Sequence, residues 1–183
     1  MNRYLIFVSC LGLVGCHSSL AIGSDCTLRK ISVTTTDPSR NEVYEGKAQT
    51  IVVQFRNENA PKTADVYPDP HVTVRNLSTA KYCDIKDGNG IWSGKSVYLD
   101  KNESVLVLNE YSGASDILAF YDTKTCRRLA ELDVSSRRWE IAEDRIRTGQ
   151  QCGGEDLTSC HHIKEIILDK GCLARESKAI TIK

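Results

Sequence analysis

Eight cysteines in a chain of 183 residues constrain the fold more than any other feature of this sequence. Two of them, Cys10 and Cys16, lie in an N-terminal stretch that has the form of an export signal. The remaining even number indicates a framework of disulfides formed in an oxidising compartment. Sequence spacing does not decide how they pair. The cysteines of this framework are Cys26, Cys83, Cys126, Cys152, Cys160 and Cys172.

The export signal has two alternative ends. A short positive start precedes an apolar run, Tyr4–Val14, which is shorter than the roughly 20 residues that span a bilayer. Ser19-Leu20-Ala21 suits a signal peptidase, so that residues 1–21 would be removed. Equally, Leu13-Val14-Gly15-Cys16 resembles a lipobox, so that residues 1–15 would be removed and Cys16 lipidated. We expect residues 22–183 to form a single β-rich domain, located in the periplasm, with membrane contact only through such a lipid.

The charges argue against a nucleic-acid partner. Lysine and arginine together number 24, as do aspartate and glutamate. Nucleic-acid binding needs a basic field, which this balance does not supply.

Alternation of apolar and polar residues, rich in β-branched types, predicts an all-β fold built from antiparallel sheets. Turn-forming residues separate the segments, for example Asn59-Ala60-Pro61 and Asp87-Gly88-Asn89-Gly90. Residues 161–169 fit either a helix or a strand. The expected strands are 31–34, 51–56, 72–75, 97–99, 105–108, 117–121, 129–134, 139–141 and 180–182.

A faint internal repeat bears on how these sheets are arranged. Asn76–Cys83 is followed by Trp92 and then by the strand at 97–99. Tyr121–Cys126 is followed by Trp139 and then by a short strand near Arg145-Ile146. Such a unit suits a propeller-like array, but a sandwich of meandering strands also produces such echoes. Within the second unit, Asp122–Thr125 is predicted to form the tight turn between neighbouring strands.

Motifs for catalysis or metal binding are weak, so we expect no enzyme, no metal and no cofactor. The segment around Ser112 lacks the Gly-x-Ser-x-Gly elbow of hydrolases. His71, His161 and His162 are the histidines beyond the leader. Cys160-His161-His162 with Asp156 resembles a zinc site, but a disulfide through Cys160 explains it better.

One segment favours recognition of a protein. Between two strongly apolar strands lies a hairpin tip of small residues and hydroxyl groups, which is narrow enough to enter an enzyme cleft. Its serines could donate hydrogen bonds, and its tyrosine could supply apolar contact at low entropic cost. An ordinary hairpin turn is the competing interpretation. The candidate partner-binding residues are Tyr111, Ser112, Gly113, Ala114, Ser115 and Asp116.

This loop resembles those of two families. Ser112-Gly113-Ala114-Ser115-Asp116 is similar to the inhibitory loop of periplasmic lysozyme inhibitors, although the tyrosine expected after that motif is missing. Size, leader and β-rich repeats also resemble the periplasmic immunity proteins of type VI secretion peptidoglycan amidases. The resemblance implies an inhibitor of a cell-wall hydrolase, with Ser112 and Ser115 plugging a cysteine–histidine active site.

An envelope glycan-binding or surface-assembly module is the alternative function. In that case four aromatic side chains would form a stacking platform on the surface rather than part of a core. They are Trp92, Tyr98, Tyr121 and Trp139.

Overall fold

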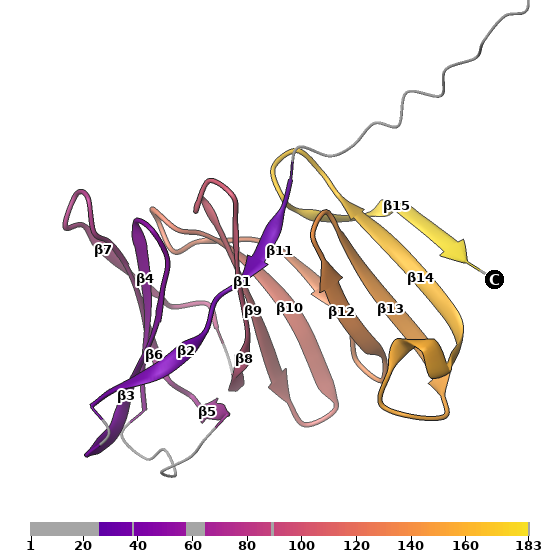
Figure 1. Ribbon diagram of the computed structural model, residues 1–183, viewed down its shortest axis with the longest axis horizontal. Helices are drawn as coiled ribbons and strands as arrows, with labels where there is room; N and C mark the ends of the chain where they lie inside the picture. Colours follow the sequence, from indigo (N-terminus) through magenta and orange to yellow (C-terminus); the bar gives the residue numbers. More distant parts are fainter. Residues whose placement is uncertain (1–25, 38, 58–64, 89, 183) are drawn as a thin grey trace, which may run out of the picture.

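A computed structural model describes residues 26–37, 39–57, 65–88 and 90–182, without the side chains of 40, 41 and 176–182. The predicted leader, its alternative ends, Cys16 and the turn at 59–61 lie outside these residues. The described chain folds into three antiparallel sheets that stack face to face as layers (Figure 1). The all-β prediction is therefore confirmed. Within this part of the chain, no helix is long and apolar enough to cross a membrane.

The three sheets follow one another along the chain, except that β1 and β5 both join the second of them. The first sheet has the order β2-β3-β4-β6-β7, formed by Val33–Asp37, Arg40–Lys47, Ile51–Arg56, His71–Asn76 and Tyr82–Ile85. The central sheet has the order β1-β8-β9-β10-β11, formed by Leu28–Lys30, Ile91–Asp100, Val105–Ser112, Ser115–Asp122 and Arg128–Asp133, and β5 (Val66–Pro68) pairs with β8. The third sheet runs β12-β13-β14-β15, formed by Arg138–Ala142, Arg145–Cys152, Cys160–Leu168 and Ala174–Ile182. A short 3-10 turn, Leu157–Ser159, precedes β14.

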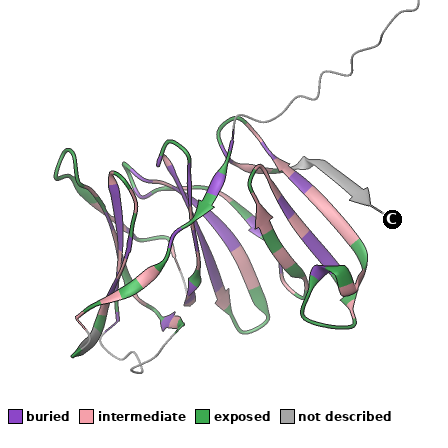
Figure 2. Ribbon diagram, viewed as in Figure 1, coloured by how far each residue is buried: buried purple, intermediate pink, exposed green. Residues whose placement is uncertain are grey.

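The central sheet is buried on both of its faces. Val105–Glu110 of β9 are consecutive buried residues, which is the pattern of a strand covered on both sides. One face packs on the first sheet around Phe55, Trp92 and Tyr121. The other packs on the third sheet around Phe120, Ile146 and Ile166. Figure 2 shows this burial concentrated where the sheets face one another. The arrangement is a sandwich extended by a third layer.

Short polar side chains fix the turns between strands. In the predicted turn, the Asp122 carboxylate accepts hydrogen bonds from the backbone N–H groups of Lys124 and Thr125 at 2.9 and 2.8 Å. Asn76 accepts one from the Thr79 N–H at 2.9 Å in the turn between β6 and β7. Asp and Asn favour such turns because their side chains bond to the backbone two or three residues further on. The two halves of the faint repeat therefore contain the same kind of turn.

The three disulfides connect the layers. Cys83–Cys126 joins β7 of the first sheet to the turn after β10 of the central sheet. Cys26–Cys172 joins the start of the described chain to the turn between β14 and β15. Cys152–Cys160 closes the loop between β13 and β14. The six cysteines expected to be oxidised are all paired, and each junction between neighbouring sheets has its own bridge.

Two sequence interpretations need correction or resolution. The ambiguous segment 161–169 is a strand up to Leu168, since β14 spans Cys160–Leu168. The proposed aromatic platform is wrong. Trp92 and Tyr121 are buried in the core with their rings stacked at 6.2 Å, and Tyr98 and Trp139 pack against the core between the central and third sheets. Burying a large aromatic side chain stabilises the fold more than leaving it exposed to solvent does.

Candidate functional site

The segment 111–116 forms the end of the hairpin between β9 and β10. Ser112 and Ser115 lie opposite each other and are joined by the two-residue turn of Gly113 and Ala114. Gly113 has φ +58°, a conformation that glycine adopts without strain. The first neighbour, β8, ends its pairing at Tyr111, and the second, β11, ends at Ile117. The four residues 112–115, which we call the tip, are exposed. They project about 7 Å beyond the last residues that pair with these two neighbouring strands, at roughly 3.4 Å per residue.

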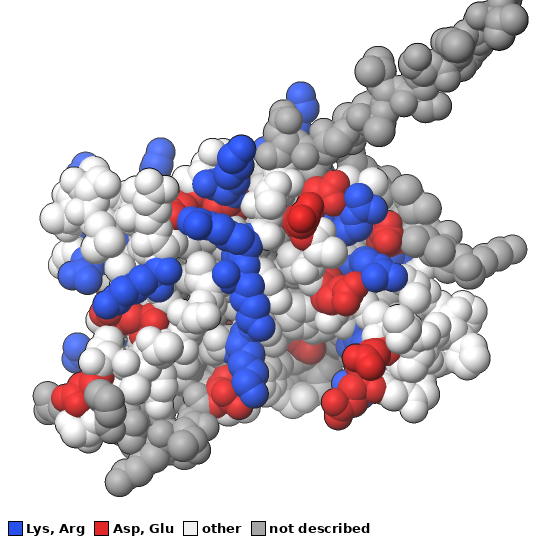
Figure 3. Space-filling model, in the orientation of Figure 1, with Lys and Arg blue, Asp and Glu red and all other residues white. Residues whose placement is uncertain are grey.

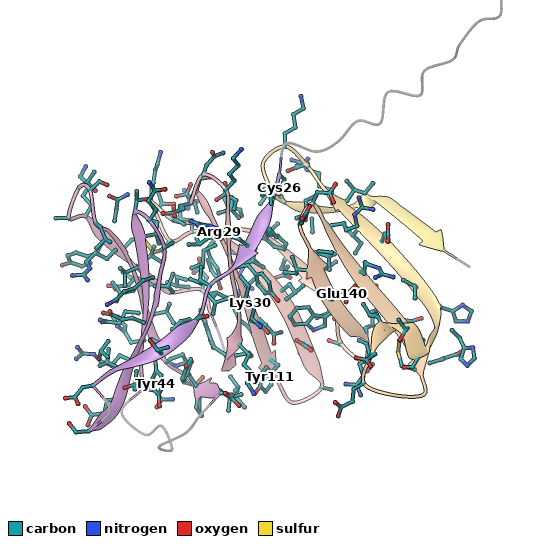
Figure 4. The ribbon with its side chains drawn as sticks, viewed as in Figure 1. Cys26, Arg29, Lys30, Tyr44, Tyr111 and Glu140 are labelled. Atoms are coloured by element: carbon teal, nitrogen blue, oxygen red, sulfur yellow. A yellow bond between two sulfur atoms is a disulfide. The ribbon has the colours of Figure 1, made fainter. Side chains whose placement is uncertain are left out.

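The two faces of this hairpin point toward different sheets. Ser112 and Ser115 share the face of Glu110 and Ile117, which continues into the core with the first sheet. Tyr111 and Asp116 lie opposite each other on the other face, toward the third sheet. Figure 4 labels Tyr111 at this end of the central sheet. The serines thus stand together on one side, and the tyrosine and aspartate stand on the other.

The serine side chains are free to bind a partner. Neither hydroxyl has a hydrogen bond within the part of the chain that the structure describes. Beside them lies a shallow hollow of about 210 Å³, lined in part by Tyr111, Ile117 and Arg128. Each hydroxyl can donate one hydrogen bond and accept others. The tip can therefore offer two hydroxyl groups to polar atoms of another molecule.

On the opposite face, Asp116 anchors the hairpin to its neighbours. Its backbone N–H donates to Ser135 Oγ at 2.8 Å, and its carboxylate accepts hydrogen bonds from Asn109 and Trp139. Burial raises the pKa of Asp116, an effect that these two hydrogen bonds partly offset. Burial and the nearby Asp116 charge also raise the pKa of Tyr111. Asp116 is thus a support of the tip rather than an exposed contact.

A buried ionic network lies directly behind the tip, and sequence reasoning missed it. Glu110 is 3% exposed and accepts a hydrogen bond from the Tyr121 hydroxyl. Arg128 Nη2 lies 2.7 Å from Glu110 and 2.8 Å from the Tyr121 oxygen. The guanidinium also lies 5.4 Å from the Tyr121 ring centre, in the range of a cation–π contact.

Electrostatics keeps the Tyr121 phenol protonated and the Arg128 guanidinium charged. Burial raises the pKa of Tyr121, and the Glu110 charge raises it further, so the phenol stays protonated. Burial alone would lower the pKa of Arg128, but Tyr121 and Glu110 raise it. Three adjacent strands, β9, β10 and β11, contribute one residue each. Their side chains fix the register of the strands that carry the tip.

A close backbone approach supports the hairpin from a third direction. Gly90 has φ +85°, and a Cβ atom there would lie 2.8 Å from the Tyr111 oxygen and 3.0 Å from Ser112 Cβ. Only glycine therefore fits without moving the chain. The segment before β8 and the base of the tip rest against each other at this point.

The suggested zinc site does not form. Cys160 is bonded to Cys152, so its sulfur is not a thiolate. Among the described residues, no group of three His, Cys, Asp or Glu side chains lies close enough to hold a metal ion.

Comparison with known proteins identifies the family to which this hairpin and its framework belong. The family model described as "Immune protein Tsi1" matches residues 26–172. This chain belongs to the Tsi1 immune protein family. "Immune protein Tsi1" of Pseudomonas aeruginosa is 33% identical over 153 residues, which cover 83% of this chain and 88% of that protein.

The match confirms the resemblance to type VI secretion immunity proteins. The matched segment begins at Cys26 and ends at Cys172, which are the two ends of one disulfide. It therefore contains the whole bridged framework and the hairpin tip. Members of an immunity family act by binding a protein effector.

Proposed function

We propose that this chain is a periplasmic immunity protein that binds a peptidoglycan hydrolase, an amidase or a lysozyme, and blocks its active site with the tip. Membership of the Tsi1 immune protein family supports a protein effector as the partner. Three disulfides suit an oxidising compartment. In this proposal residues 1–21 are a removed signal, with lipidation at Cys16 as the alternative, and residues 22–183 form the single domain.

The observation that carries the proposal is an exposed tip, held at its base, whose two serine hydroxyl groups form no hydrogen bond within the described part of the chain. Ser112 and Ser115 face the same side at the end of a hairpin whose base is held by Glu110 and Asp116. A projection of about 7 Å suits the depth of a hydrolase cleft better than a flat surface. Because the tip is fixed before binding, little conformational entropy is lost when it enters.

The proposal leads to a direct binding test. The oxidised chain from residue 22 onward is titrated calorimetrically into a panel of peptidoglycan amidases with cysteine–histidine sites and of lysozymes. We expect one class to bind with inhibition of peptidoglycan cleavage. Replacing Ser112 and Ser115 together by tryptophan should weaken that binding by at least about 100-fold, because steric exclusion and lost hydrogen bonds act together.

A matched control separates the tip from general effects of added tryptophan. Ser78 and Lys124 are exposed and lie in the turns after β6 and β10, at the other end of the sheets. The double variant Ser78→Trp/Lys124→Trp should bind as the unchanged protein does. Equal affinity of the Ser112/Ser115 variant and the unchanged protein would remove the tip from the mechanism.

A further inference from the structure

A second polar surface lies beside the tip, on the inner face of the third sheet. It is a hollow of about 250 Å³. We call it the cationic hollow and define it by the residues that line it, Arg137, Thr148, Gln150, His162, Ile163 and Lys164. Among the residues whose side chains the structure describes, no carboxylate lines it.

The strand pattern explains why this hollow is polar although it lies on a core face. Ile146 and Ile166 face each other across β13 and β14 and are fully buried against the central sheet. Two residues further along the same face, the facing pair becomes Thr148 and Lys164. The next facing pair is Gln150 and His162. The apolar face thus ends before the strands do. Thr148 is polar but still buried, and the face becomes open to solvent at Gln150 and His162.

The charges of the cationic hollow differ from those on the outer face of the same sheet. On the outer face, Arg145 lies 3.1 Å from Glu165 and Arg147 lies 2.7 Å from Glu140. Figure 3 shows the resulting mixture of red and blue over the third sheet. In the hollow, neither Arg137 nor Lys164 forms an ion pair with a carboxylate of the described chain. Asp133 attracts Arg137 at longer range.

Another basic surface is already partly neutralised. A column of Lys and Arg crosses the face shown in Figure 3, where Figure 4 labels Arg29 and Lys30. Arg29 in this column is paired with Glu103. The cationic hollow is therefore the stronger candidate for an external anion, because binding there breaks no existing ion pair.

The cationic hollow adjoins the hairpin. The Trp139 side chain donates a hydrogen bond to Asp116 at the base of the tip. Trp139 lies directly opposite Thr148 on the same face of the third sheet, and Thr148 lines the hollow. Figure 1 shows the β9–β10 turn and the β13–β14 loop at the same end of the molecule. A partner seated on the tip would therefore also cover the hollow.

We propose that the cationic hollow receives acidic side chains of the hydrolase whose active site the tip enters. This inference rests on the proposed function and names a second contact of the same interface. The arginine fork matches a carboxylate in two-point contact, and the lysine adds a mobile charge. Such complementary charges guide association and fix orientation, while the tip supplies the block. Thr148 and Gln150 can complete the hydrogen bonds of a bound carboxylate.

Charge reversal tests the assignment. Arg137→Glu/Lys164→Glu is compared with the unchanged chain against the hydrolase that binds tightest in the panel above, at 50 and 500 mM NaCl. We expect the Kd to rise at least about tenfold at low salt and the difference to shrink to about threefold or less at high salt. The control Lys81→Glu/Lys124→Glu, at the other end of the sheets, should stay within about twofold. Arg137→Gln/Lys164→Gln guards against misfolding and should show a smaller loss.

Each outcome separates the two proposals. If the Ser112/Ser115 variant loses binding while charge reversal in the hollow leaves Kd unchanged at both salts, the inference is wrong and the proposed function stands. If no hydrolase binds, the proposed function fails, and the hollow is then tested alone by NMR titration with a hexaglutamate peptide. Shifts of the Thr148, Gln150 and Lys164 amides support an acidic protein ligand. Silence at these amides, or shifts with muropeptides only, overturns it.

Discussion

The disulfide between the first and central sheets should stabilise the protein more than the bridge within the third sheet. Cys83 and Cys126 are 43 residues apart in sequence, whereas Cys152 and Cys160 are separated by 8. In the chain-entropy account, a cross-link stabilises the protein by restricting the unfolded chain, and the stabilisation grows with the logarithm of the loop length. That relation gives about 4 kcal/mol for the longer loop and about 2.5 kcal/mol for the shorter one.

The pairs of variants to compare are Cys83→Ala/Cys126→Ala and Cys152→Ala/Cys160→Ala. Cys126 is 3% exposed, so the loss of its packing adds to the larger effect. Urea unfolding under non-reducing conditions, followed by tryptophan fluorescence, gives the free energy of unfolding of each variant. With a slope near 2 kcal/mol/M, the midpoints should fall by about 2 M and about 1.2 M.

A result in the reverse order would refute this reasoning. If the variant without Cys152–Cys160 lost as much unfolding free energy as the other, loop entropy would not control the contribution of these bridges. Both variants should retain the other two disulfides, which mass spectrometry of the unreduced proteins verifies. The absolute values depend on structure left in the unfolded chain, so the difference of about 1.5 kcal/mol is the sharper quantity.

Three further predictions concern the residues that support the tip. Glu110→Ala should lower the free energy of unfolding by about 3 kcal/mol in urea titrations, because it leaves the Arg128 charge without its buried partner, whereas Glu131→Ala, at an exposed partner of Arg128, should cost less than about 1 kcal/mol. The free energy of unfolding of Asp116→Asn minus that of the parent should be larger at pH 7 than at pH 3. The folded pKa of Asp116 is raised, so ionisation of this carboxyl group opposes folding as the pH climbs above the unfolded pKa near 3.9. A variant-minus-parent difference that is flat with pH would contradict this. Gly90→Ala should displace the base of the tip and weaken hydrolase binding by at least about tenfold in calorimetry, while Gly153→Ala, where a Cβ meets no atom within 4 Å, should have little effect.

Sequence patterns predicted the strands whose side chains are apolar on at least one whole face. Ile51–Arg56 was predicted with the bounds that the structure has, since its β-branched residues fill a core face. The strand Arg40–Lys47 was missed because its charged and polar residues hide a strand that pairs on both sides. Strand Arg145–Cys152 was recognised only near its start, because its outer face bears arginines and its inner face turns polar beyond Ile146. A strand that is buried at one end only does not show a simple alternation of apolar and polar residues along its length.

The hairpin that carries the candidate site was predicted from the sequence, but the residues that support it were not. Small residues between two apolar runs indicated the hairpin, and the tip lies there. Nothing in the sequence marked Glu110 as buried, because its partners Tyr121 and Arg128 come from two later strands. The disulfide pairing was equally inaccessible, since Cys26 and Cys172 are 146 residues apart and meet only when β1 joins the central sheet. Contacts between distant segments decide both features.

The supports of the tip act from different directions, and this bears on how an inhibitor of this shape can work. Gly90 limits movement at the base, the Glu110 network lies on the first-sheet face, and Asp116 binds Trp139 on the third-sheet face. A hairpin held on one face alone could swing away from that face, whereas one held on both can move only by breaking a buried contact. The tip itself has a two-residue turn and short side chains, so few rotamers remain to be ordered on binding. If the proposed function holds, affinity for the hydrolase should depend on the buried residues that hold the tip as much as on the two serines. Substitutions behind the tip should then slow association less than they speed dissociation.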